Sequence, residues 1–391
     1  MKIAIFTDTY PPEINGVATS CRNLYRTLTE HGEKVMVVTT NPWNEELYED
    51  GDIVRIPGIK LKKLYGYRAA PFFNKEAMRL VHDFKPDVIH SQHDAGVGQF
   101  GFIAANRLNL PVVYTFHTMY EDYTYYATKG FMDRAAKGIV RQYIHYKSKT
   151  ADEFICPSSK IKEYMRSIGI DSYISVIPTG IDFSAFDRRK VNRKLVNEIR
   201  RQYGIPNSTY VILSLGRVAK EKSIDICLKG YAKYLANGPT RETLFVVVGG
   251  GPALKDLKKL VSELRIEDHV IFMGPVNPDS VPLYYQLGNC FVSASITETQ
   301  GLTFMEAMAS SIVLFARYDD TLLGTIKDGD NGFFFIDEDD FAMKLPKIVA
   351  LNGSRLKGIV EAGLQSIEPY SLERFYRNVM EVYRRAVKKG W

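Results

Sequence analysis

Two glutamates, Glu298 and Glu306, stand eight residues apart in a segment that could bind a phosphate-bearing ligand. The apolar residues Phe291 and Val292 predict the end of a strand before them, and residues 302–309 predict a helix that carries Glu306. The backbone N–H groups at such a helix start attract phosphate, because they lack partners inside the helix and lie at the positive end of its dipole. The two carboxylates could then accept hydrogen bonds from sugar and ribose hydroxyls. Alternatively, both are ordinary solvated acids.

Backbone and basic groups that suit a diphosphate lie in the same half of the sequence. In the turn before the helix, backbone N–H groups would face outward, those of Thr299, Gln300, Gly301 and Leu302. After a predicted strand, Gly216 is followed by Arg217 and Lys222, whose side chains could clamp a diphosphate without a metal. Basic residues after a strand are also commonly solvated. Gly250, in the Gly-Gly-Gly-Pro run 249–252, offers another close backbone approach, although this motif is weak.

Two loops of the first half are further candidates. A proline-rich stretch ends in Asn15 and Gly16, and the glycine could bring backbone N–H groups close to an anion; an ordinary turn before a helix is the alternative. His117 closes a strand at its carboxyl end, where ligands of parallel sheets bind, although a lone histidine is more often structural. The sequence has no Walker phosphate loop, no glycine fingerprint in its first winding and no hydrolase arrangement of nucleophile, histidine and acid.

These loops must be positioned by strands and helices that alternate in a pattern occurring twice. The first half has six short apolar runs that predict strands: Lys2–Phe6, Lys34–Thr39, Val88–Ser91, Val112–Thr115, Glu153–Cys156 and Ile174–Ile177. The second half has five: Val211–Leu215, Leu244–Val248, Val270–Met273, Cys290–Ser293 and Ile312–Ala316. Buried strands between helices imply parallel sheets, and two sets imply an α/β fold of two Rossmann-like domains. Because ligands bind at the carboxyl ends of such strands, we expect the domains to face each other across a cleft.

A charged, turn-rich stretch between Pro178 and about Lys194 marks the boundary between the two domains. We therefore predict a first domain over residues 1–185 and a second over 186–370, in agreement with a length of 391 residues, which exceeds what one core usually supports. The final helix, within residues 371–391, has no strand partner and is predicted to pack back on the first domain.

Composition places the chain among ordinary globular proteins, with 45% hydrophobic and 25% charged residues. No apolar run approaches the roughly 20 residues that span a bilayer, and the first residues lack a signal peptide's layout, so we expect a protein kept in the cytoplasm. The four cysteines are scattered without paired spacing, which predicts reduced thiols and neither a zinc site nor a disulfide framework.

The chain resembles the retaining glycosyltransferases of family 4, which have the two-Rossmann GT-B fold, over essentially its whole length. The resemblance rests on an ordered set of motifs: Asn15-Gly16, His117, Gly216-Arg217 with Lys222, Gly249 to Pro252, and Glu298 with Glu306. It implies a nucleotide-sugar donor held mainly by the second domain and an acceptor held mainly by the first.

The resemblance also implies a role for each candidate residue. Arg217 and Lys222 would bind the diphosphate, Glu298 the donor-sugar hydroxyls and Glu306 the ribose, and His117 would lie beside the transferred sugar. No metal and no other cofactor is expected, because the two cations replace the metal. Transfer would then proceed by same-face attack, in which the leaving diphosphate takes the acceptor's proton and Glu298 orients the sugar. Further predicted donor-binding residues are Gly16, Gly216, Gly250, Val276 and Thr299 to Leu302.

A basic amphipathic stretch indicates an anionic membrane surface as a partner. Six cations and one acid between Lys129 and Lys149 give a net charge of +5. Arg134, Lys137 and Arg141 fall on one face of a predicted helix, where each cation is worth about 1 kcal/mol near anionic lipid. A solvated helix is the alternative. Nucleic acid is a weaker interpretation, because the net charge of +6 is modest and no binding motif occurs.

Three segments resemble one subgroup of the family, the bacterial diacylglycerol glucosyltransferases: Thr7 to Val17, Phe116 to Tyr123, and Arg317 to Leu322. The resemblance implies transfer of glucose from UDP-glucose to diacylglycerol by a peripheral, monotopic enzyme on the inner face of the cell membrane. Tyr120 would then join Asn15 and the basic residues on the acceptor or membrane side. In one departure, Tyr318-Asp-Asp320 stands where many members have a glycine pair before Pro-Glu, so donor contacts of that loop cannot be transferred.

Two alternatives stay open. A related retaining transferase could use GDP-mannose, UDP-galactose or UDP-sulfoquinovose, or a different lipid or soluble acceptor. A non-catalytic nucleotide-sugar sensor is less favoured, since a sensor has little need of the full set of Glu298, Arg217, Lys222 and His117. The oligomeric state is left open by the sequence.

Overall fold

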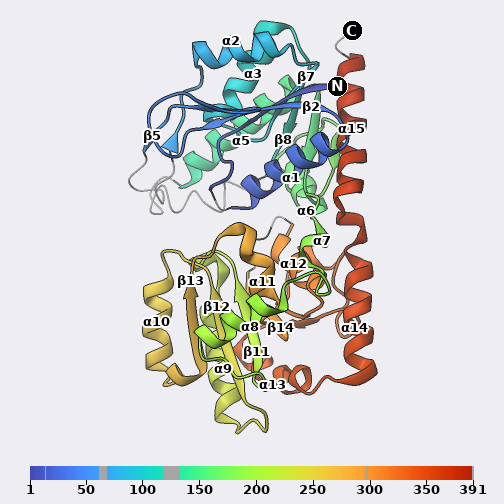
Figure 1. Ribbon diagram of the computed structural model, residues 1–391. Helices are drawn as coiled ribbons and strands as arrows, with labels where there is room; N and C mark the ends of the chain where they lie inside the picture. Colours follow the sequence, from blue (N-terminus) through green and yellow to red (C-terminus); the bar gives the residue numbers. More distant parts are fainter. Residues whose placement is uncertain (14, 61–67, 118–132, 296–297, 299, 390–391) are drawn as a thin grey trace. The chain divides into compact units, whose positions relative to one another are not determined.

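The computed structural model describes residues 1–13, 15–60, 68–117, 133–295, 298 and 300–389, and it divides the chain into two compact α/β units (Figure 1). The first unit comprises Met1–Gly180 and Leu372–Trp391, and the second comprises Ile181–Ser371. The sequence analysis placed the first limit at residue 185. Residues 181–185 lie in the second unit because Ile181 and Phe186 are buried in its core.

The first unit is built on an eight-stranded sheet in the order β10-β9-β8-β7-β1-β2-β4-β3. All neighbouring pairs are parallel except β3 with β4, at the edge. The strands are β1 (Lys2–Thr7), β2 (Lys34–Thr40), β3 (Tyr48–Asp50), β4 (Ile53–Ile56), β7 (Val88–Ser91), β8 (Val112–Thr115), β9 (Glu153–Cys156) and β10 (Ile174–Val176). A separate antiparallel pair joins β5 (Ile59–Lys60) to β6 (Arg68–Ala69).

Helices cover both faces of this sheet, because its strands are apolar on both sides. One face packs on α2 (Lys75–Phe84), α3 (Gly96–Leu108), α5 (Asp133–Thr150) and α6 (Ser159–Ser167). The other face packs on α1 (Gly16–Glu30) and on the C-terminal helix α15 (Leu372–Lys389), whose Val379 and Tyr383 share a buried cluster with Ile3 and Ile5 of β1.

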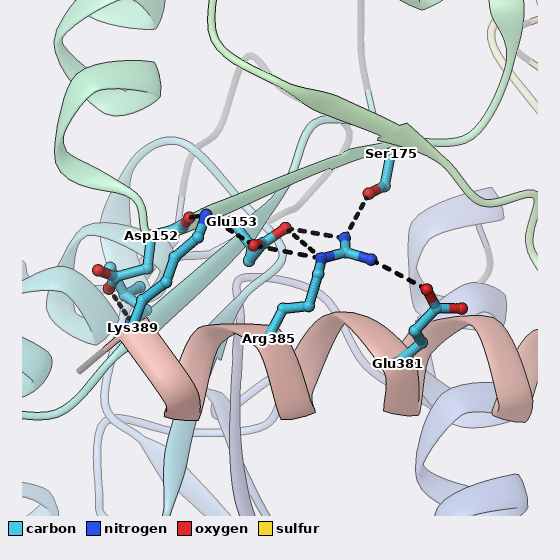
Figure 2. Close-up of polar contacts among 7 residues, drawn as sticks. Asp152, Glu153, Ser175, Glu381, Arg385 and Lys389 are labelled. Carbon is cyan, nitrogen blue, oxygen red and sulfur yellow. Dashed lines mark hydrogen bonds and ion pairs between the residues drawn. The ribbon is translucent and has the colours of Figure 1, made fainter. Parts of the chain in front are cut away.

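An ion-pair network also fastens α15 to the sheet, as Figure 2 shows. Arg385 donates from Nη2 to Oε2 of Glu153 at 2.9 Å and to the Ser175 hydroxyl at 2.9 Å, and Lys389 lies 2.8 Å from the second oxygen of Glu153. Burial acts to raise the pKa of Glu153, but hydrogen bonds from the two cations hold that pKa below its usual value. The network therefore favours the docked helix when Glu153 is ionised.

The second unit is built on a six-stranded parallel sheet in the order β13-β12-β11-β14-β15-β16. The strands are β11 (Tyr210–Leu215), β12 (Thr243–Val248), β13 (Val270–Gly274), β14 (Cys290–Ser293), β15 (Val313–Arg317) and β16 (Phe333–Phe335). Two buried clusters, one on each face of the sheet, form its core.

The helices of the second unit complete the α/β pattern. They are α7 (Phe183–Phe186), α8 (Arg193–Gln202), α9 (Ile224–Ala236), α10 (Leu254–Glu263), α11 (Val281–Tyr285), α12 (Leu302–Ala309), α13 (Glu338–Val349) and α14 (Gly353–Ser366). Five single-turn 3-10 helices connect them: η2 (Lys220–Lys222), η3 (Glu267–His269), η4 (Pro278–Ser280), η5 (Asp320–Leu322) and η6 (Glu368–Tyr370). Among all the helices described, none combines the length and the apolar character needed to cross a membrane.

The two parallel sheets confirm the predicted fold class, and all eleven predicted strands are present to within one residue at each end. The sequence analysis missed the polar edge strand β3, its neighbour β4, the two-residue pair β5 and β6, and β16, which has only three residues. Such short segments carry too little periodicity to be distinguished from loops.

Candidate functional site

The predicted donor loops of the second unit lie at one edge of its sheet. Strands β12, β11 and β14 are parallel neighbours, so their carboxyl ends meet at the same edge. The loop with Gly216 and Arg217 follows β11, the glycine run 249–251 follows β12, and the segment with Glu298 follows β14.

The glycine run packs directly against the loop after β11. A Cβ atom on Gly249 would lie 1.8 Å from the carbonyl oxygen of Gly216, and the φ angle of Gly249 is +135°. The Val218 N–H donates to the carbonyl oxygen of Gly250 at 2.9 Å. Gly249 is thus required by the close approach of the two loops, whereas a Cβ atom on Gly250 would lie no nearer than 3.4 Å to Pro275.

The structure brings two of the predicted site residues into direct contact. Nζ of Lys222, at the end of η2, donates to Oε1 of Glu298 at 2.6 Å, and the two side chains are 31% and 14% exposed. Arg217 forms an ion pair with Glu221, on the same short helix as Lys222. Both predicted diphosphate ligands are therefore paired with carboxylates.

Helix α12 begins at Leu302, as the sequence predicts, and its N-cap residue is Gly301. The φ angle of this residue is +79°, and a Cβ atom there would lie 2.5 Å from the Phe304 ring, so a side chain at this position would be strained. Gln300 is buried and Leu302 is half-buried at the helix start. Thr299 lies outside the described residues.

Glu306 is held by a residue that the sequence analysis did not find. Oε2 of Glu306 accepts a hydrogen bond of 2.8 Å from the hydroxyl of Tyr285, on α11. Tyr285 is fully buried, and burial, followed by the charge of Glu306, raises its pKa well above the usual value. Glu306 is therefore a partly buried, oriented carboxylate. The remaining predicted donor residue, Val276, is half-buried after β13 and packs against the core of the unit.

An open hollow of about 750 Å³ lies beside the loop after β15, and its lining includes neither Lys222 nor Glu298. Its walls include Arg317, Tyr318 and Ile336, and Tyr318 is 48% exposed. The loop in which this chain departs from the family pattern therefore borders a hollow of its own.

Candidate residues of the first unit also follow parallel strands. Asn15 caps α1, because its Oδ1 accepts from the Ala18 N–H at 2.8 Å, and Gly16 is the first residue of that helix. His117 follows β8, and its Nε2 lies 2.5 Å from Oε1 of Gln92, which follows the neighbouring strand β7. Burial, together with the nearby His93 and His90, lowers the pKa of His117 to about 3, so the ring is neutral.

Helix α5 includes the predicted basic face, and the structure describes the exposure of its cations Arg141 and Lys147. Arg141 is exposed, whereas Lys147 is fully buried, with its ammonium 3.5 Å from the centroid of the Phe102 ring. Burial lowers the pKa of Lys147 to about 7. Lys147 therefore does not belong to the surface charge of +5 counted from the sequence. Arg134 and Lys137 are within α5; Tyr120 and Lys129 lie outside the described residues.

Three residues that the sequence did not predict hold the predicted ones in place: Gln92, Tyr285 and Glu221. Gln92 could have been found, since it follows a predicted strand in the same way as His117. Tyr285 and Glu221 lie on helices and carry no local signal. Among the described residues, no group of histidine, cysteine or acidic side chains has the arrangement of a metal site.

Comparisons with known proteins match both halves of the chain. Residues 14–185 match the model of Glycosyltransferase Family 4, and residues 196–363 match that of Glycosyl transferases group 1. The alpha-monoglucosyldiacylglycerol synthase of Streptococcus pneumoniae (strain ATCC BAA-255 / R6) is 34% identical over 99% of this chain and 86% of its own length. The enzyme of the same name from Acholeplasma laidlawii is 32% identical over 100% and 98%.

Solved structures with the GT-B fold are similar over nearly the whole chain. A glycosyltransferase from Rickettsia africae ESF-5 has a TM-score of 0.74 at 18% identity, covering 99% of this chain and 98% of its own. Anabaena Alr3699/HepE, solved in complex with UDP-glucose, also has a TM-score of 0.74, at 16% identity and coverages of 98% and 99%. These similarities confirm the fold.

Proposed function

The chain belongs to the glycosyltransferases of family 4, and we propose that it is a retaining enzyme that transfers glucose from UDP-glucose to diacylglycerol at a membrane surface. The observation that carries the proposal is the pairing of Lys222 with Glu298 beside Arg217, at the carboxyl edge of the second sheet. Two relatives matched over essentially the whole chain are named for synthesis of the corresponding glucolipid.

The two ion pairs give the proposed donor a defined way to bind. The diphosphate would compete with Glu221 for Arg217 and share Lys222 with Glu298, so that both cations keep an anionic partner throughout. Glu298, held beside Lys222, would accept hydrogen bonds from the sugar hydroxyls, and Glu306, oriented by Tyr285, from the ribose. UDP-glucose as donor is supported by the bound ligand of the Anabaena structure.

Charge in the leaving diphosphate would be stabilised by protein groups rather than by a metal. We propose that Arg217, Lys222 and the start of α12 stabilise that charge, because donors aimed at a developing charge are the most effective in electrostatic catalysis. We propose that the diphosphate takes the acceptor's proton on the face from which it leaves, so that the product keeps the donor's anomeric configuration.

On the acceptor side, we propose that α5 docks on the anionic inner face of the cell membrane and that the protein stays peripheral there. Arg141 is exposed on this helix, and an exposed cation gains about 1 kcal/mol near anionic lipid. His117 lies at the carboxyl end of β8, in the unit that we propose binds the acceptor.

The test is transfer of label from UDP-glucose to diacylglycerol in vesicles, with and without anionic lipid and with EDTA present. We expect a glucosyl lipid with an α-anomeric proton coupling, a yield that rises with anionic lipid, and no loss in EDTA. Release of UDP with no lipid product would support a UDP-glucose-dependent transferase but refute diacylglycerol as its acceptor. A β-linked product would refute retention, and loss of activity in EDTA would refute metal independence.

A further inference from the structure

A buried chain of polar side chains leads from the C-terminal helix to His117. The hydroxyl of Tyr383, on α15, lies 2.7 Å from Nδ1 of His90, on β7, and Nε2 of His90 lies 2.7 Å from Oγ1 of Thr115, the last residue of β8. Gln92 contacts His90 through its amide nitrogen and His117 through its amide oxygen.

Sheet geometry explains why these side chains meet. Strands β7 and β8 are parallel neighbours in the register His90 with Val113, and side chains alternate between faces along each strand. His90 and Gln92 therefore share one face with Thr115 and His117, and this is the face on which α15 packs. The chain is shielded from water, since His90, Gln92 and Tyr383 are at most 3% exposed.

His90 fixes which way the Gln92 amide points. The amide nitrogen lies 3.2 Å from Nδ1 and 3.0 Å from Nε2 of the His90 ring, and a position this close to both nitrogens lies over the ring face. Burial lowers the pKa of His90 to about 3, so the ring is neutral and its electron-rich face attracts an N–H group. The reversed amide would place its oxygen on that face and be repelled.

The orientation of Gln92 in turn selects one form of His117. The amide oxygen can only accept, and it lies 2.5 Å from Nε2 of His117, so this nitrogen must carry the proton. Nδ1 of the neutral ring is then unprotonated and is an acceptor.

We propose that Gln92 is a positioning residue that holds His117 in the neutral Nε2–H form, and that His90 and Tyr383 fix the orientation of Gln92. The proposal assigns to the C-terminal helix a part in ordering the acceptor-side site. It rests on the proposed function only for its kinetic consequence, because the state of the His117 ring can be measured without any substrate.

The first test is NMR spectroscopy of the full-length protein labelled with ¹⁵N-histidine. The signals of His117 are identified by their absence in His117→Ala. We expect the Nε2–H tautomer in the wild type, with no titration between about pH 5 and pH 8, since the pKa is near 3. An Nδ1–H tautomer, or a ring that becomes charged in this range, would overturn the proposal, and this measurement needs no folded variant of Gln92.

Two substitutions separate positioning from packing. Gln92→Met keeps the length of the side chain but removes the acceptor, so His117 should populate both tautomers and kcat should fall roughly 10- to 100-fold with little change in donor KM. Gln92→Glu keeps an acceptor and adds a charge, so the pKa of His117 should rise and turnover should decline on the acid side of the pH profile. Unchanged tautomer and unchanged turnover in Gln92→Met would refute the positioning role.

Gln99→Met is the matched control. Gln99, on α3, accepts a 3.0 Å hydrogen bond from the Tyr143 hydroxyl in the same unit and is not part of the chain to His117. Its substitution should leave the His117 signals unchanged. If none of the proteins transferred glucose to lipid while the wild-type ring remained Nε2–H, the proposed acceptor would fail and the positioning of His117 would stand.

Discussion

Lys222 and Arg217 each form an ion pair with a carboxylate, and these pairs determine what the loss of either cation should do. Replacing either with Ala should lower turnover by about 10²- to 10³-fold, because a charge-stabilising donor acts mainly on the transition state. Lys222→Ala also leaves Glu298 without its 2.6 Å partner, so affinity for the donor should fall as well. Initial rates and UDP calorimetry measure the two effects.

Lys220→Ala is the control for both substitutions, because Lys220 begins the same 3-10 helix and is exposed. It should keep nearly full activity. Wild-type turnover in Arg217→Ala and Lys222→Ala would contradict the diphosphate assignment.

Tyr285 is predicted to act on the donor through Glu306. Tyr285→Phe removes a buried hydroxyl that donates to a carboxylate, a contact worth about 1.5–3 kcal/mol. We expect lower stability towards urea and a donor KM raised several-fold, with kcat changed less, since the ribose does not react. Tyr284→Phe, at the half-buried neighbouring position, should change neither quantity. An unchanged donor KM in Tyr285→Phe would contradict a role for the Tyr285–Glu306 hydrogen bond in donor binding.

At the scale of elements, the ion-pair network between α15 and β9 should make the free energy of unfolding depend on pH. The lowered pKa of Glu153 means that its stabilising contribution is fully present above the ordinary value of 4.5 and is lost as the pH falls through the lowered pKa. Glu153→Gln should therefore destabilise the protein at pH 7, and its difference from the wild type should shrink as the pH falls below 4.5 through the lowered pKa. Urea unfolding over a series of pH values from 7 downward tests this, and a difference independent of pH would contradict it.

A second arginine on the same helix provides a control for this ion-pair network. Arg385 contacts a glutamate that is 2% exposed, whereas Arg377 pairs with Glu373 at the surface, where both side chains are at least 50% exposed. Arg385→Ala should lower stability clearly, and Arg377→Ala by at most about 1 kcal/mol.

Helix α5 allows the membrane prediction to be tested on two cations of one element. Arg141→Gln should weaken binding to anionic vesicles by about 1 kcal/mol, or roughly fivefold, and the difference should shrink at high salt. Lys147→Met should leave vesicle binding unchanged, because the Lys147 side chain is buried against Phe102. Equal effects of the two substitutions would contradict docking through the exposed face. Vesicle sedimentation measures both.

These elements also show how far the sequence could predict the structure. The strands of both sheets were predictable because buried parallel strands are continuous apolar runs, as in residues 245–248. The pairing of Lys222 with Glu298 could not be predicted, because it joins residues 76 positions apart. The burial of Lys147 could not be predicted either, since a charged residue within a basic run is normally solvated. The position of Gln92 against His117 likewise depends on the register of β7 with β8.

For the whole molecule, the decisive feature is that the first unit contains both ends of the chain. Helix α15 buries several apolar side chains against the first sheet, among them Phe375, Val379, Met380, Val382 and Tyr383. At about 1.5–3 kcal/mol each, their burial is comparable with the entire stability of a typical domain. The first unit should therefore not be stable without the last helix, although its sheet is complete by residue 176.

Deletion of residues 372–391 tests this dependence. We expect the first unit to unfold or aggregate, while the second, Ile181–Ser371, keeps its own two-sided core and a cooperative unfolding transition. Hydrogen exchange should then show lost protection in β1, β7 and β8 and retained protection in β11 and β12. Adding a peptide of residues 372–391 in excess should restore part of the protection, because the apolar face that it covers is formed by the sheet. Full protection of β1 and β7 in the truncated chain would show that α15 is dispensable for the first unit.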